Sequence, residues 1–163
     1  MLVVVCGLPG VGKSTVARFI AEEIDAERLR TDIVRKELVD EPAYTDAERR
    51  AVYEELYDRA EARVAAADDV VLDGTFWATR LRDRAAAIAD EHDAEFVLVR
   101  VTCNAEIAER RIAERESDAS DADVAVHTQF REDFDPIERD HVTIDNSEDR
   151  DRTREQVENV FRP

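Results

Sequence analysis

The sequence from residue 7 to residue 15 reads Gly7-Leu8-Pro9-Gly10-Val11-Gly12-Lys13-Ser14-Thr15, which satisfies the pattern G-x-x-x-x-G-K-[ST]. A β-branched apolar run, Leu2–Cys6, precedes it, and apolar residues at helical spacing follow it as far as Ile24. The glycines allow successive backbone N–H groups to turn inward around a phosphate, and the positive end of the following helix adds its dipole. The pattern therefore predicts that residues 7–15 bind the phosphates of a nucleotide.

Two side chains of this loop have separate expected roles. Lys13 should reach the outer phosphates of ATP, and the Ser14 hydroxyl should hold Mg²⁺. Lys13 is one of only two lysines, the other being Lys36, among 23 lysines and arginines. Because arginine takes almost every other basic position, a lysine retained here indicates a requirement of the loop. The alternative is a glycine-rich turn that only joins a strand to a helix.

Length and composition indicate one globular domain over residues 1–163. Hydrophobic residues make up 44% of the chain, and no Pro-, Gly- or Ser-rich linker divides it. Cys6 and Cys103 are too few for a disulfide framework or a metal cluster. The apolar runs are short for a membrane span and no signal peptide is recognisable, so we expect a cytoplasmic protein without membrane contacts.

The charge balance is strongly acidic, with 40 acidic against 23 basic residues and a net charge of −17. Such a surface could repel nucleic acid and favour cationic partners. Alternatively, the composition is that of a salt-loving microbe, which we favour because the acidic residues are spread along the chain. Molar salt shortens the Debye length to about 3 Å, so the net charge then says little about the substrate.

Strands and helices alternate along the chain. We expect strands at Leu2–Cys6, Glu27–Arg30, Val70–Leu72, Glu95–Val101 and His141–Ile144. We expect helices at Lys13–Ile24, Ile33–Val39, Thr45–Ala67, Arg80–Asp90, Ala105–Arg115, Val124–Phe134 and Thr153–Phe161, the third opened by the capping box Thr45-Asp46-Ala47-Glu48. This order predicts a three-layer α/β fold with a mostly parallel sheet of about five strands.

Two aspartates follow strands and are candidate site residues. Asp32 comes directly after the second strand, which we expect to lie next to the phosphate loop, and Asp73 ends the third. Ligands of such sheets bind at the carboxyl ends of the strands, so both carboxylates should lie near the nucleotide. A helix cap for Asp32 and a turn aspartate for Asp73 are the structural alternatives.

Four segments together resemble the small phosphate-loop kinases. They are the loop Gly7–Thr15, the stretch Thr31–Leu38, the stretch Val70–Phe76 and the stretch Glu109–Arg115. This group includes polynucleotide 5′-hydroxyl kinases, gluconate kinases, zeta-type toxins and many "AAA domain" ATP-binding proteins, and the match runs from Val3 to about Asp145. The resemblance implies a P-loop NTPase fold with a helical lid at about residues 110–123.

The resemblance also implies roles for individual residues. Asp32 would accept the proton of an acceptor hydroxyl or orient it, and Arg35 would contact the acceptor. Asp73 and Thr75 would line the acceptor pocket, while Asp73 could equally reach Mg²⁺ through water. Arg111 and Arg115 lie four residues apart on one helix face and would close over the phosphates. An ordinary solvated face, with the arginines paired to neighbouring glutamates, is the alternative.

These observations favour an ATP-dependent phosphotransferase that moves the γ-phosphate to a hydroxyl group. The acceptor stays open between a polynucleotide end and a small metabolite, because Arg28, Arg30, Arg35 and Lys36 could serve either as a basic groove or as anion clamps. No obligate protein partner is evident. A nucleotide-dependent regulatory ATPase or switch without a separate acceptor is the alternative, although no Asn-Lys-x-Asp motif for guanine is present.

Overall fold

The computed structural model describes residues 1–116 and 130–162, with the side chains of residues 115 and 116 left out. The strands are β1 (Leu2–Cys6), β2 (Glu27–Arg30), β3 (Val70–Asp73), β4 (Phe96–Thr102) and β5 (Val142–Asp145). The helices include α1 (Lys13–Glu23), α2 (Thr31–Leu38), α3 (Asp46–Ala65), α4 (Thr79–Glu91), α5 (Ala105–Glu116) and α7 (Arg150–Phe161), with a short helix over 130–133.

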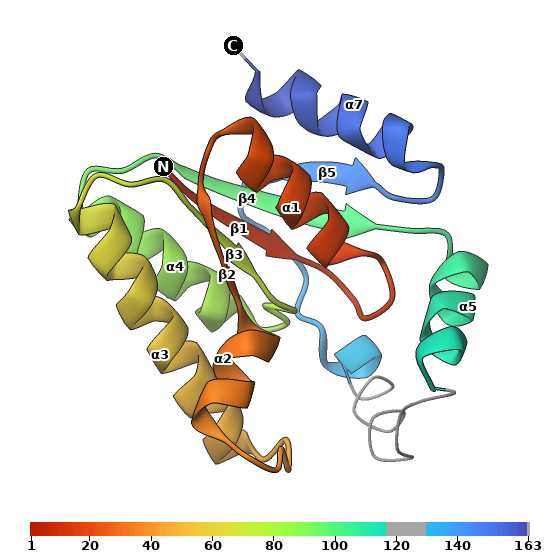
Figure 1. Ribbon diagram of the computed structural model, residues 1–163, viewed down its shortest axis with the longest axis horizontal. Coiled ribbons are helices and arrows are strands. Elements are labelled where there is room, and N and C mark those ends of the chain that lie inside the picture. The colour runs from red at the N-terminus through yellow and green to blue at the C-terminus, as the bar shows by residue number, and fades with distance from the viewer. Residues whose placement is uncertain (117–129, 163) are drawn as a thin grey trace.

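The five strands form one parallel sheet in the order β2-β3-β1-β4-β5. The central strand β1 pairs with β3 on one side and β4 on the other, so that Leu2 lies opposite both Val70 and Phe96. Figure 1 shows α3 and α4 together on one face of the sheet and α1 and α7 on the other. The prediction of an α/β fold with a five-stranded parallel sheet is confirmed.

The alternating side chains of β1 divide the core into two layers. Leu2 and Val4 pack on the side of α3 and α4, while Val3 and Val5 pack on the side of α1 and α7. All five residues of β1 are fully buried. Because both faces are covered, β1 is apolar throughout, as parallel strands usually are.

Helix starts differ from the expectations by up to three residues. Helix α7 begins at Arg150 because the Asp149 carboxylate caps it, accepting a hydrogen bond from Arg152 N at 2.9 Å. The expected capping residue of α3 is in place, since Glu48 N donates to Thr45 Oγ1 at 3.2 Å. Of the helix expected at 124–134, the part before residue 130 lies outside the described residues.

The strand order corrects one expectation about the site. β3, and not the second strand, pairs with β1 on the side of Asp32. Asp73 therefore ends the strand beside the phosphate loop, while Asp32 lies one strand further out. None of the helices in the described part of the chain combines the length and apolar character that a membrane span requires.

Candidate active site

The loop between β1 and α1 has the backbone of a phosphate cradle. Gly10 and Gly12 have φ angles of 81° and 88°, a region that favours glycine. A Cβ atom on Gly10 would lie 2.7 Å from the Ala108 carbonyl oxygen, and one on Gly12 would overlap the Asn146 side chain. Both the turn and its packing against later parts of the chain therefore require glycine.

A cleft of about 230 Å³ opens beside this loop at the carboxyl edge of the sheet. Its lining consists of Pro9, Gly10, Gly12, Lys13, Ser14, Thr31, Asp32, Arg35, Tyr44, Arg49, Tyr53, Asp73, Gly74, Thr75, Trp77 and Phe130. Gly7, Leu8 and Val11 instead line a second cavity beside β4. Thr15 lies in the first turn of α1, where its N–H donates to Gly12 O at 3.1 Å.

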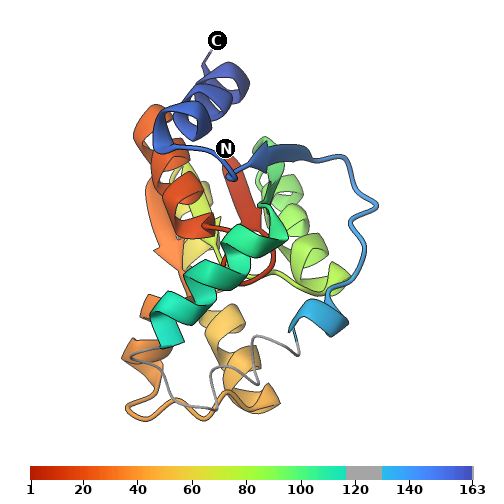
Figure 2. The ribbon, with the colours of Figure 1, turned by 90° about the vertical axis from the view of Figure 1, so that its right-hand side faces the viewer.

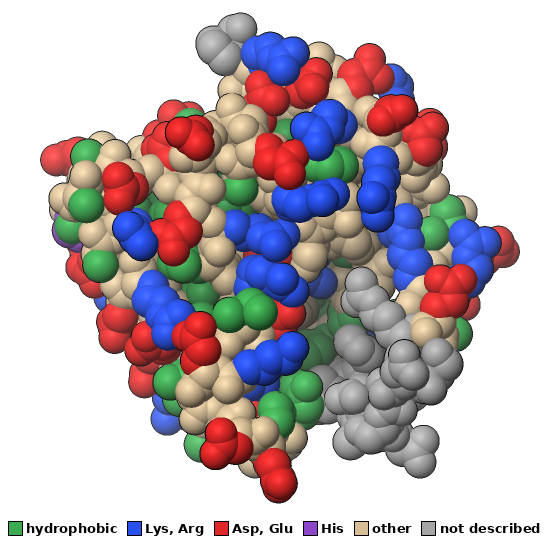
Figure 3. Space-filling model, in the orientation of Figure 1, with side chains coloured by type: hydrophobic (Ala, Val, Ile, Leu, Met, Phe, Trp, Pro, Cys, Tyr) green, Lys and Arg blue, Asp and Glu red, His purple; other side chains and the backbone are tan. Residues whose placement is uncertain are grey.

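The charge distribution of this face differs from the net charge. In Figure 3 basic side chains gather in the middle of the face, and most of the acidic ones lie around its rim. Lys13 Nζ donates to Leu8 O at 2.9 Å, so the lysine lies folded over the loop. The cleft lining includes three basic residues, Lys13, Arg35 and Arg49, beside Asp32 and Asp73, although the chain carries −17.

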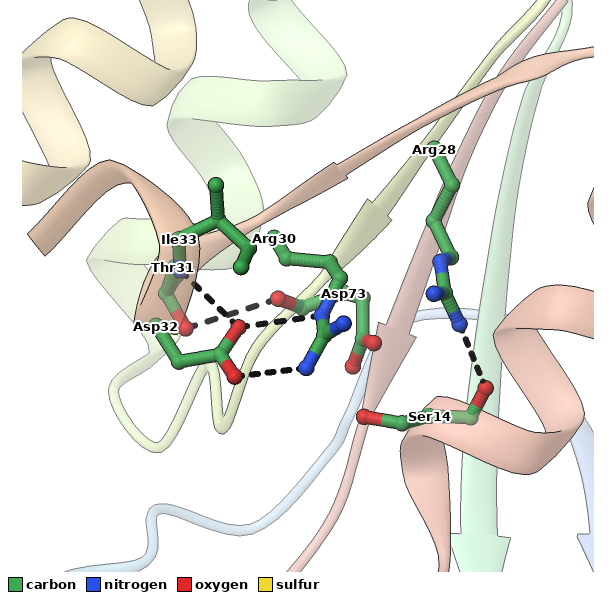
Figure 4. A network of polar contacts seen from close by, with 7 residues as sticks. All are labelled: Ser14, Arg28, Arg30, Thr31, Asp32, Ile33 and Asp73. Atoms are coloured by element: carbon green, nitrogen blue, oxygen red, sulfur yellow. Dashed lines mark hydrogen bonds and ion pairs between the residues drawn. The ribbon is translucent and has the colours of Figure 1, made fainter. Parts of the chain in front are cut away.

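Asp73 and Ser14 face each other beneath the loop (Figure 4). Asp73 is 5% exposed, and its Oδ2 is buried without a hydrogen-bond partner in the described part of the chain. Burial raises the pKa of the Asp73 carboxyl, and the Ser14 hydroxyl and the Lys13 charge oppose that rise. A carboxylate oxygen beside a hydroxyl is a donor set that suits a hard cation such as Mg²⁺.

Asp32 lies in the first turn of α2 and does not cap it. Arg30 holds its carboxylate with two contacts, Nε–Oδ1 at 3.0 Å and Nη2–Oδ2 at 2.6 Å. Ile33 N also donates to Asp32 Oδ1 at 3.0 Å. Figure 4 shows the Asp32 carboxylate turned toward Arg30. This two-pronged geometry fixes the orientation of a side chain that is 52% exposed.

The far end of the cleft combines arginines with aromatic rings. Arg35 lies between the Glu48 carboxylate, with Nε–Oε1 at 2.9 Å, and the ring of Tyr44, 4.9 Å from its guanidinium carbon. Thr75 also lines the cleft, and its carbonyl oxygen accepts from Gly7 N of the phosphate loop at 3.3 Å. The structure thus places Lys13, Asp32, Arg35, Asp73 and Thr75 around one cleft.

This end is also lined by three residues that were not among the predicted site residues: Arg49, Tyr53 and Phe130. Arg49 lies 5.2 Å from the Phe130 ring centroid, and Phe130 packs 5.2 Å from Trp77. The Tyr53 hydroxyl accepts from Phe76 N at 3.0 Å. These residues come from distant parts of the chain. The sequence indicates only that Tyr53 lies on the buried side of an amphipathic helix, and it does not indicate that the three residues meet.

A buried arginine fixes the turn that carries Trp77. Arg82 is 2% exposed and donates to the carbonyls of Phe76, Trp77, Asp135 and Pro136 and to Thr79 Oγ1, at 2.8 to 3.3 Å. These contacts join the segment after β3 to the segment that follows the short helix over 130–133. Arg82 thereby helps to position Trp77, in the turn after β3, against Phe130, in the short helix.

The expected lid arginines differ in what the structure describes. Arg111 donates to the backbone of the loop at Val11 O (3.3 Å) and to Asn146 O (3.2 Å). It therefore ties α5, which faces the viewer in Figure 2, to the phosphate loop. Arg115 belongs to the last turn of α5, but its side chain lies outside the described residues, as do residues 117–123 of the expected lid.

Asn146 completes this attachment. It is 5% exposed, donates from Nδ2 to Val11 O at 2.9 Å and accepts from Thr153 Oγ1 at 2.9 Å. The loop is thus held from behind by both α5 and the segment after β5, which leaves its other side open to the cleft.

Comparison with known proteins agrees with this architecture. The chain is 32% identical over 176 residues to an uncharacterized protein of Mycobacterium tuberculosis, a match that covers 99% of this chain and 34% of that protein. The chain thus spans about a third of that relative.

Two solved kinases have similar structures at low sequence identity. The M. tuberculosis APS kinase CysC, in complex with AMPPNP and APS, gives a TM-score of 0.78 at 18% identity, covering 99% of this chain and 97% of the other. A gluconokinase from Sinorhizobium meliloti gives 0.71 at 17% identity, with coverages of 98% and 92%. These likenesses show the fold of the phosphate-loop kinases and leave the acceptor open. A family model described as AAA domain matches residues 2–137, and the chain therefore belongs to the AAA domain family.

Proposed function

We propose that the protein is an ATP-dependent phosphotransferase that moves the γ-phosphate of ATP to a hydroxyl acceptor. The observation that carries this proposal is that one cleft is lined both by the phosphate loop and by Asp32, Arg35 and Thr75. A regulatory ATPase needs room only for water beyond the γ-phosphate. Here the cleft continues to an end built from two arginines and four aromatic residues.

The loop residues bind the nucleotide phosphates through their backbone N–H groups. Lys13 exchanges its contact with Leu8 O for the outer phosphates. Ser14 and Asp73 are the residues that would hold Mg²⁺, whose bound charge offsets the negative charge of the phosphate oxygens. Asp73 Oδ2, which is buried and has no hydrogen-bond partner among the described residues, supports this assignment.

Asp32 prepares the acceptor. Its carboxylate takes the hydroxyl proton as the acceptor oxygen forms a bond to the γ-phosphorus, and the bond from that phosphorus to the β–γ bridging oxygen breaks to release ADP. Arg30 keeps the carboxylate in place by its two contacts. Arg35 and Thr75 help to position the acceptor, because this reaction depends mainly on alignment and electrostatic stabilisation.

We assign closure over the transferred phosphate to Arg115, which lies four residues beyond Arg111 on α5. Arg111 keeps the middle of that helix attached to the loop through Val11 O. A positive charge added at the γ-phosphate stabilises the transition state.

A γ-phosphate tracing assay with Mg-ATP in molar KCl tests the proposal. The acceptors are offered as separate pools of 5′-hydroxyl oligonucleotides, nucleosides, sugars, sugar acids and sugar phosphates. We expect label on a compound of at least one pool. Label released only as inorganic phosphate would instead identify a regulatory ATPase, and ATP binding without release would identify a nucleotide-binding module.

A further inference from the structure

The two arginines at the far end of the cleft differ in how their charges are balanced. Arg35 is paired with Glu48, whose side chain is only 7% exposed, at an Nε–Oε1 distance of 2.9 Å. The other Glu48 oxygen, Oε2, accepts hydrogen bonds from Ala43 N and Tyr44 N. A carboxylate fixed by these contacts is a permanent counter-ion, so the pair brings no net charge to the cleft.

Within the described residues, Arg49 has no such counter-ion. Its ion pair there is with Asp46, whose side chain is 95% exposed, at an Nη1–Oδ1 distance of 3.3 Å. Pairs with a fully solvated carboxylate are weak because water and salt screen them. The side chain of Arg49 itself is only 13% exposed. Its positive charge is therefore partly desolvated and poorly compensated.

The donors and surroundings of Arg49 also favour a ligand. Its Nε is buried, and no hydrogen-bond acceptor reaches it within the part of the chain that the structure describes. The guanidinium lies near the rings of Phe130 and Trp77, at 5.2 and 5.9 Å from their centroids. Aromatic rings hold the cation in place without neutralising it. A buried donor without a partner costs free energy that a bound anion would recover.

We propose that the phosphate acceptor carries an anionic group of its own, a carboxylate or a phosphate, and that Arg49 binds this group. The proposal rests on the proposed phosphotransferase function and narrows its substrate class to small hydroxylated acids or phosphate esters. The volume of the cleft, about 230 Å³, suits a small compound. Arg49 becomes a specificity-determining residue, whereas Arg35 shapes the cleft together with Glu48.

The acceptor pools described above, sorted by charge, provide the first test. We expect label in the sugar-acid or the sugar-phosphate pool. Which of the two is labelled shows whether the anionic group of the acceptor is a carboxylate or a phosphate. Arg49→Gln should lower kcat/KM for the labelled anionic acceptor at least about tenfold, because a charge-assisted hydrogen bond is lost. Arg49→Lys should recover part of that loss. Labelling of neutral sugars or of oligonucleotides alone would overturn the proposal.

If no pool is labelled, the proposed phosphotransferase function is refuted. A binding measurement then still tests whether Arg49 binds an anion. Inorganic phosphate or acetate is added at constant ionic strength to protein saturated with AMPPNP and Mg²⁺, and the unfolding midpoint is followed. We expect the anion to raise the midpoint of the wild type and of Arg63→Gln but not of Arg49→Gln. Arg63 lies near the other end of α3 and pairs with Glu27 outside the cleft, which makes it a matched control. An equal rise in all three proteins would exclude Arg49 as the anion site.

Discussion

The two ends of the cleft are built in different ways. The phosphate end comes from one short segment within residues 9–14, with Asp73 as its partner from the adjacent strand. The acceptor end combines Arg35 from α2, Arg49 and Tyr53 from α3, Trp77 from the turn after β3, and Phe130 from the short helix over 130–133. The first end depends on local backbone geometry, and the second depends on how four separate elements pack.

This difference indicates which properties the two ends control. A cradle of backbone N–H groups binds any nucleotide phosphate, so it serves many acceptors without change. Side chains from separate elements can be exchanged one at a time, so the acceptor end determines specificity. Variants at the phosphate end should therefore abolish reaction with every acceptor, whereas variants at the acceptor end should discriminate among acceptors.

The largest effect is expected for Lys13→Ala. Loss of the lysine charge at the outer phosphates should lower turnover roughly 10³-fold for every acceptor. The control is Lys36→Ala, which removes the only other lysine, an exposed residue of α2. Turnover is measured by γ-phosphate transfer and folding by thermal unfolding. Equal activities of the two variants would refute the assignment of the phosphate end.

Asp32→Asn should lower kcat roughly 10²-fold, because the amide cannot take the acceptor proton. The affinity for ATP, measured by calorimetry, should stay within a few-fold of the wild type, since Asp32 binds no phosphate. Arg30→Gln is the companion variant: it leaves the carboxylate in place but removes its two contacts, and it should have a smaller effect on kcat. If Asp32→Asn weakened ATP binding as much as turnover, Asp32 would belong to the phosphate end.

Arg82→Met should affect the acceptor end through folding. The variant leaves carbonyls such as Phe76 O and Asp135 O without their buried donor, which should cost about 2 kcal/mol of unfolding free energy. Denaturant unfolding measures this loss. Because Arg82 positions Trp77, KM for the acceptor should rise while ATP affinity stays close to wild type. A variant with unchanged unfolding free energy would show that the hydrogen bonds of Arg82 do not stabilise the fold.

Much of the fold was predictable because its signals are local. The apolar run Leu2–Cys6, the glycine loop and the capping box at Thr45 each act within a few residues, and each lies where expected. The strand order was not predicted, although the charged sequence of β2 is typical of an edge strand and the apolar sequence of β3 is typical of an inner strand. β3 pairs with β1, at the position where the second strand was expected.

The candidate site likewise contains residues that local sequence signals predict and residues that they do not. Lys13, Ser14 and Asp73 follow from a motif and from the end of an apolar strand, and the structure brings them together. Arg49 could not be distinguished from the other arginines of a long charged helix. Its environment depends on Phe130, which lies 81 residues further along the chain, and only tertiary packing brings the two together. The acceptor end is therefore the part for which sequence patterns give least information.

The smallest effect, and the one that links the site to stability, is expected for Asp73→Asn. Burial raises the pKa of Asp73, so the folded protein binds this proton more tightly than the unfolded chain does. The contribution of Asp73 to unfolding free energy therefore falls as pH rises from the usual aspartate pKa through the raised value. Asparagine carries no charge and avoids this penalty, so the nucleotide-free variant should unfold at a higher temperature than the wild type at pH 7. The difference should shrink as the pH is lowered and Asp73 becomes protonated in both states of the wild type.

The same substitution should weaken ATP binding in the presence of Mg²⁺, because Asp73 is the proposed carboxylate at the metal. Without Mg²⁺, the variant should bind ATP at least as well as the wild type, since a negative charge near the phosphates has been removed. Calorimetric titrations with and without Mg²⁺, together with thermal unfolding across the pH range, separate these effects. A variant that is less stable at pH 7 and equally sensitive to Mg²⁺ would mean that Asp73 serves the turn before Gly74 and not the metal. A gain in stability together with a loss of Mg²⁺ dependence would instead show that the buried Asp73 carboxylate lowers the stability of the free protein and is needed for binding Mg²⁺.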